Sequence, residues 1–153
     1  MIVTINWKPA ISLKDFESGN LSWKEEDIMA NEGVLYCFEG EKKNSGKEGV
    51  DIGQTTRSLA IRTKEHMNKK DYLEGFPLNQ MVRCGIVSVK SRIVDKELLE
   101  QVEGALIQYA QDKKPEMVLC NQSKIESYTK TYDIDCICNL GERGIFPTYV
   151  WNV

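Results

Sequence analysis

The sequence lacks the features that several classes of protein require. It has one histidine, His66, and five cysteines without a Cys-x-x-Cys pair, so a zinc site is not expected. No apolar run approaches the ~20 residues that cross a bilayer, and residues 1–16 lack the basic lead and apolar core of a secretory signal. We therefore expect a cytoplasmic protein that does not span a membrane and whose cysteines are reduced and structural.

Charge is also not strongly of one sign. The 153 residues, enough for one domain, carry a net charge of −3 with a pI near 5.3, whereas nucleic-acid binders more often show a basic excess. However, residues 41–70 hold eight Lys or Arg against four Asp or Glu, a local charge of +4, which leaves −7 for the rest. This basic region is either ordinary solvated surface or a site for a phosphate-bearing partner.

Apolar alternation and short apolar runs predict extended segments near both ends and in the middle of the chain. These segments are residues 2–7, 34–38, 50–53, 81–90, 134–139 and 146–151.

Capping residues predict three helices. Ser22 and Glu25 have the spacing of a capping box for a short helix over 23–30, and Thr55 or Thr56 can cap a helix that reaches Lys69. The clearest helix begins at Asp95, with apolar residues at helical spacing: Leu98, Val102, Ala105, Leu106 and Tyr109. The order of elements fits an α+β domain with a small sheet flanked by helices.

Three polar residues are candidates for chemistry, although each has an ordinary structural interpretation. His66 follows Arg62 by four residues, so both project from one face of the predicted helix. Glu103 lies at the border of the apolar stripe, where a carboxylate can hold a metal in a partly dry cleft or simply face solvent. Asn121 can belong to a site or cap a turn.

Taken together, five segments resemble a known family. They are Gly33-Val34-Leu35-Tyr36, Val50-Asp51-Ile52-Gly53-Gln54-Thr55, Arg62-x-x-x-His66, Glu103-x-x-Leu106-Ile107 and Pro115 to Asn121. In this order, over about residues 33–123, they resemble the motifs of the GIY-YIG nuclease superfamily.

The resemblance implies a small α/β core with a three-stranded antiparallel sheet flanked by helices. The core would cover residues 33–131, residues 1–32 would be a lead-in packed on it, and residues 132–153 would add C-terminal strands to the same domain. The implied activity is hydrolysis of DNA phosphodiester bonds with one divalent metal, Mg²⁺ or Mn²⁺.

By matching positions, the resemblance implies a catalytic set, a metal ligand and substrate contacts. The catalytic set is Tyr36, Arg62, His66 and Asp51; Glu103 holds the metal; Asn121, Gly53 and Lys64 bind substrate. An arginine fork suits phosphate oxygens, and Mg²⁺ held by one carboxylate keeps several waters. Tyr36 would position or deprotonate the attacking water, with His66 as a relay at neutral pH.

One position departs from the family pattern, because Asp51 stands where the second motif normally has tyrosine. An aspartate cannot donate a phenolic proton, although it can accept a proton or approach a metal through water. The leading interpretation is an endonuclease that acts on DNA, with a possible protein partner that supplies specificity. The alternatives are a degenerate module that binds nucleic acid or protein without cutting, and an unrelated small α/β protein with chance matches.

Overall fold

The computed structural model describes residues 1–12, 14–15, 33–41, 46–55, 78–114, 116–119, 128–151 and 153. Its strands are β1 (Ile2–Trp7), β2 (Ile11–Ser12), β3 (Val34–Glu41), β4 (Glu48–Thr55), β5 (Leu78–Val89), β6 (Val118–Leu119), β7 (Cys136–Gly141) and β8 (Tyr149–Trp151). The long helix is α5 (Lys96–Lys113). The helices predicted over 23–30 and from 56 to 69 lie outside the described residues.

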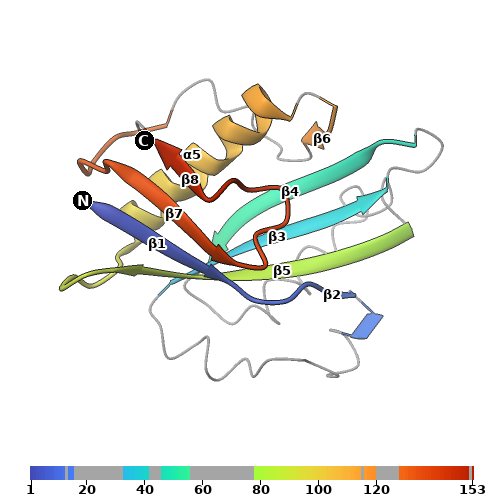
Figure 1. Ribbon diagram of the computed structural model, residues 1–153, viewed down its shortest axis with the longest axis horizontal. Coiled ribbons are helices and arrows are strands. Elements are labelled where there is room, and N and C mark those ends of the chain that lie inside the picture. The colour runs from blue at the N-terminus through green and yellow to red at the C-terminus, as the bar shows by residue number, and fades with distance from the viewer. Residues whose placement is uncertain are drawn as a thin grey trace.

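These strands join in one mixed sheet. Seven follow the order β6-β4-β3-β5-β1-β7-β8, and β2 pairs with β5 beside this path. The sheet curls into a half-barrel, and α5 lies along one side of it (Figure 1). Among the described residues, no helix has the length and apolarity needed to cross a membrane.

The prediction of a three-stranded antiparallel sheet flanked by helices is therefore wrong. Strands β4, β3 and β5 are antiparallel neighbours, but they form only part of a larger sheet. The reason lies in β1, whose Val3, Ile5 and Trp7 are almost completely buried. It pairs antiparallel with β5 and parallel with β7, so residues 1–32 and 132–153 both supply strands to the sheet.

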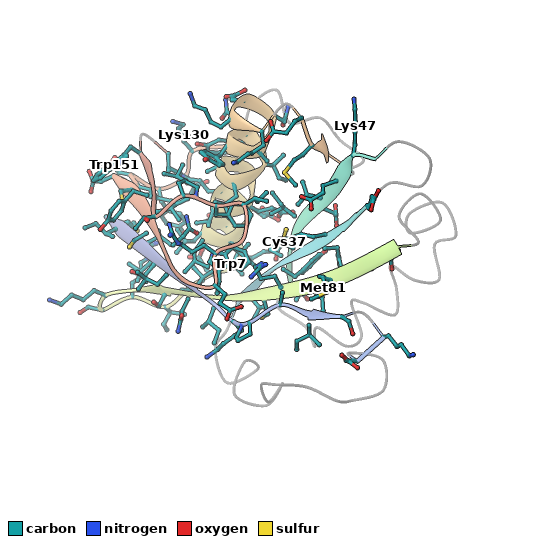
Figure 2. The ribbon with its side chains drawn as sticks, turned by 45° about the vertical axis from the view of Figure 1, so that its right-hand side comes forward. Trp7, Cys37, Lys47, Met81, Lys130 and Trp151 are labelled. Carbon is teal, nitrogen blue, oxygen red and sulfur yellow. The ribbon has the colours of Figure 1, made fainter. Side chains whose placement is uncertain are left out.

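Alternation along β3 and β4 gives the sheet two distinct faces. Leu35, Cys37, Val50 and Ile52 belong to the same core as the buried residues of α5, and we call their side the helix face. Because neighbouring residues of a strand point in opposite directions, Val34, Tyr36 and Phe38 lie on the other side, which we call the far face. Figure 2 labels Trp7 and Cys37 near the middle of the molecule, and both belong to the buried core.

The described cysteines are buried or half-buried: Cys37, Cys84, Cys136 and Cys138. Burial, followed by the nearby Glu39 carboxylate, raises the pKa of Cys37 well above its ordinary value. The thiol therefore stays protonated, which agrees with a structural role and not with that of a nucleophile. Cys120 lies outside the described residues.

Helix α5 begins where the sequence predicts it. Asp95 is the N-cap, and its carboxylate accepts hydrogen bonds from the Leu98 amide at 2.9 Å and the Tyr132 hydroxyl at 2.6 Å. Tyr132 is itself held by Gln101, whose side chain donates to and accepts from the Tyr132 backbone at 2.9 and 2.8 Å. The start of the helix is thus tied to the segment that leads into β7.

Asp95→Ala is expected to lower the free energy of unfolding by about 1 kcal/mol at pH 7, because an N-cap is lost. The Tyr132 hydroxyl, and then the Leu98 amide, hold the pKa of Asp95 below its usual value. Such a carboxylate stabilises the fold above its unfolded-state pKa, near ~3.9, and this contribution is lost as the pH falls.

In urea unfolding, the difference in the free energy of unfolding between the wild type and Asp95→Ala should accordingly shrink as the pH falls from about 5 to about 2. Tyr132→Phe removes the hydroxyl that donates to the Asp95 carboxylate. The difference in the free energy of unfolding between the wild type and Tyr132→Phe should therefore show part of the same pH dependence. A difference that stays constant with pH would contradict the assigned role of Asp95.

Candidate functional site

Three of the predicted site residues meet on the hairpin formed by β3 and β4. The register pairs Tyr36 with Gly53 and Phe38 with Asp51. Because residues directly opposite each other in a sheet share a face, the side chains of Tyr36, Phe38 and Asp51 all lie on the far face. The first two of the five segments that carry the resemblance are therefore brought together.

The Tyr36 ring lies directly over Gly53. A Cβ added to Gly53 would overlap Cζ and Oη of Tyr36 and would lie 2.6 Å from its Cε2. The ring also packs against Phe38, with centroids 5.2 Å apart. The Tyr36 ring occupies the space that a side chain at position 53 would need, which explains the glycine.

This group is closed to solvent. Tyr36 is 2% exposed and Asp51 is 6% exposed. A tyrosine that positions water on a phosphate must reach that phosphate, and a buried ring fixed over a neighbouring strand does not do so in this conformation. Tyr36 and Gly53 therefore have a demonstrable packing role.

Glu103 lies on the other side of the sheet. It is half-buried on α5, between the buried residues Val102 and Gly104. Helix α5 packs on the helix face, whereas Tyr36 and Asp51 point to the far face. The structure therefore separates the proposed metal ligand from the proposed catalytic tyrosine by the thickness of the sheet.

The other predicted site residues, Arg62, Lys64, His66 and Asn121, lie outside the described residues. Within the part of the chain that is described, no three His, Cys, Asp or Glu side chains gather in a way that could hold a metal ion. The described residues do not fit a metal site that joins Glu103 to Tyr36, and a role of Glu103 in binding Mg²⁺ or Mn²⁺ stays a prediction.

A second candidate site was not predicted from the sequence. It is a cavity of about 220 Å³ between the C-terminal half of α5, residue 128 and β8. Its walls include Tyr109, Tyr128 and Trp151. The one available signal was an aromatic residue in the last strand, Trp151, which is 63% exposed. Exposed aromatics of this kind often mark binding surfaces.

Comparison of the chain with protein-family models, with curated proteins and with solved structures gave no significant match in any of the three.

Proposed function

We propose that this chain is a nucleic-acid-binding protein that resembles the GIY-YIG nucleases and does not cut. The observation that carries the proposal is the separation of Glu103 from Tyr36 across the sheet, together with the burial of Tyr36 and Asp51. Cleavage by the family's residue set requires these side chains to act on one phosphate, and their placement works against it.

Nucleic acid is the proposed partner for two reasons. The ordered motifs resemble those of DNA-cutting enzymes, and residues 41–70 carry a local charge of +4 in an otherwise acidic chain. Lysine and arginine that neutralise phosphates release counterions, which gives sequence-independent affinity that falls with salt. An acidic remainder limits this attraction to one part of the protein.

The first test is cleavage of supercoiled plasmid with Mg²⁺ and with Mn²⁺. We expect no nicking above background for the wild type, and the same result for Glu103→Ala. Metal-dependent nicking by the wild type that is lost in Glu103→Ala would overturn the proposal and establish an endonuclease. That second function is favoured by one observation, the meeting of Tyr36, Asp51 and Gly53 on one hairpin.

The second test is binding of fluorescent single-stranded and duplex DNA, followed by anisotropy at increasing salt. Affinity should fall as salt rises, and Lys69→Glu with Lys70→Glu should weaken binding by about tenfold at low salt. Lys90→Glu with Lys96→Glu makes the same change of charge at exposed lysines outside the basic segment and is the matched control. Equal losses in both double variants would assign the effect to net charge and not to residues 41–70.

A further inference from the structure

We infer that two copies of this chain associate through the edge strand β8, which pairs antiparallel with β8 of the second copy around a two-fold axis at Val150. This contact would join the two sheets into one continuous sheet. It goes beyond the proposed function and uses neither the β3–β4 hairpin nor residues 41–70, so either proposal can fail without the other.

The backbone of β8 has one edge without a strand beside it. Among the described residues, β8 is the last strand of the sheet and pairs only with β7. The Asn139 amide donates to the Thr148 carbonyl at 2.7 Å, so these two residues form a hydrogen-bonded pair. Such pairs alternate along an antiparallel ladder, so Val150 also points its backbone groups to β7, whereas Tyr149 and Trp151 point theirs to the outer edge. Within the described part of the chain, these outward groups have no hydrogen-bond partner.

The side chains of β8 add an aromatic surface to this edge. Val150 lies opposite the core residue Ile137 and is on the helix face, so Tyr149 and Trp151 point to the far face. They are 51% and 63% exposed, and their rings lie 5.6 Å apart. Figure 2 shows Trp151 at the periphery of the molecule. Unpaired strand edges are templates for another strand, and aromatic residues are enriched in protein interfaces.

The segment that contains β8 is free of charge. Natural edge strands commonly avoid pairing with another chain through lysine, other charged residues or proline. Residues 148–153 contain no charged side chain and no proline, although 28% of the whole sequence is charged. Two copies of this segment can therefore approach each other without placing like charges on opposite strands. This neutrality favours a second copy of the chain as the partner.

The strand is also complementary to itself. With Val150 on the two-fold axis, Tyr149 of each copy lies opposite Trp151 of the other, because positions equally far from the axis pair. The outward amide and carbonyl groups of Tyr149 and Trp151 then bond to each other, and each ring gains a cross-strand aromatic neighbour on the far face. The two Val150 side chains meet on the helix face, beside the cavity of about 220 Å³ between α5 and β8.

The small size of the contact determines how strong it is. One short strand and two aromatic side chains from each copy bury less than the ~800 Å² per partner of a standard interface, and interfaces below this size are typically transient. We therefore expect a monomer–dimer equilibrium that shifts toward the dimer as the protein concentration rises.

Sedimentation equilibrium of the full chain over a range of concentrations measures this association. Trp151→Ala should raise the dissociation constant of the dimer by about tenfold or more. Tyr149→Ala and Tyr149→Pro both remove the ring, and only proline also removes the outward N–H. Proline is tolerated at the first residue of an edge strand, so the monomer should stay folded by circular dichroism. Tyr149→Pro should therefore weaken association more than Tyr149→Ala does.

A disulfide tests the register of the two strands. The residue on the axis forms a non-hydrogen-bonded pair with its copy, with Cα atoms roughly 4.5 Å apart, and a disulfide bridges Cα atoms about 4.4–6.8 Å apart. Val150→Cys should therefore yield a covalent dimer with oxidised glutathione as the oxidant. Leu140→Cys, at an exposed position on the neighbouring strand β7, should yield no more dimer than the wild type. The wild type, which has five cysteines of its own, measures the background.

Leu140→Ala is the matched control for sedimentation, because Leu140 is an exposed apolar residue of β7 away from the outer edge of β8. It should associate as the wild type does. A wild type that stays monomeric at every concentration would overturn the inference. A dimer that Leu140→Ala weakens as much as Trp151→Ala would indicate face-to-face packing of the sheets and would also overturn it. Equal association of Tyr149→Ala and Tyr149→Pro, with no covalent dimer of Val150→Cys, would exclude the pairing of β8 with its copy.

Discussion

Asn139→Ala is expected to lower the free energy of unfolding by about 2–4 kcal/mol, because it strands two buried polar groups and leaves a cavity. Asn139 is fully buried on β7. Its Oδ1 accepts a hydrogen bond from the Trp7 indole at 2.9 Å, and its Nδ2 donates to the Pro147 carbonyl at 3.0 Å. Trp7 in turn stacks on Phe146, with centroids 4.9 Å apart. One side chain thus joins β1, β7 and the segment before β8.

Urea or thermal unfolding at neutral pH measures the effect. Asn6→Ala, an exposed asparagine on the adjacent strand β1, is the matched control and should change stability by less than about 0.5 kcal/mol. In a Trp7→Phe background the indole donor is gone, so Asn139→Ala should cost less than in the wild type. If Asn139→Ala lowers the free energy of unfolding equally in the wild type and in Trp7→Phe, the hydrogen bond from the indole to Asn139 does not contribute to stability.

Gly53→Ala is expected to destabilise the fold by about 1–3 kcal/mol, because the new methyl group overlaps the Tyr36 ring. The ring is 2% exposed and packed against Phe38, so it cannot move aside without displacing its neighbours. The same substitution tests the meaning of the motif, since a glycine that only contacts substrate would tolerate alanine without loss of stability.

Tyr36→Leu separates these two explanations. In that background Gly53→Ala should cost clearly less than in the wild type, and the difference is the coupling energy between ring and glycine. If Gly53→Ala unfolds at the wild-type denaturant concentration, the packing account of Tyr36 and Gly53 is wrong. Gln54→Ala, at the next position of β4, controls for a change in strand propensity.

Local patterns were sufficient for some of the elements, and insufficient for their assembly. Alternation predicted β1 with its observed bounds, and Asp95 with the apolar stripe predicted α5. The same alternation does not reveal which strands are neighbours. The pairing of β1 with β7 joins residues more than a hundred positions apart. Asn139 is a polar residue in the core, and hydrophobic periodicity does not predict a buried polar residue.

The candidate sites divide in the same way. The hairpin that pairs Tyr36 with Gly53 follows from two short apolar segments near each other in the sequence. The side of the sheet on which α5 packs depends on tertiary contacts. That side determines whether Glu103 can lie close to Tyr36. The cavity combines Tyr109, which reads as part of an apolar stripe, with Tyr128 and Trp151 from other segments. Only the assembled fold brings these three residues to one cavity.

The position of β1 also determines when the sheet can be completed during synthesis. Ile2 to Trp7 are synthesised well before one of their two partner strands, β7, at residues 136–141. Until then the edge of β1 that later pairs with β7 presents unpaired backbone groups, a template for pairing with another chain. Contacts of such long sequence separation also fold slowly, because the entropy of closing the intervening loop comes first. Between the synthesis of β1 and that of β7 the nascent chain therefore has an open sheet edge, and this is the interval in which a chaperone would have the most effect.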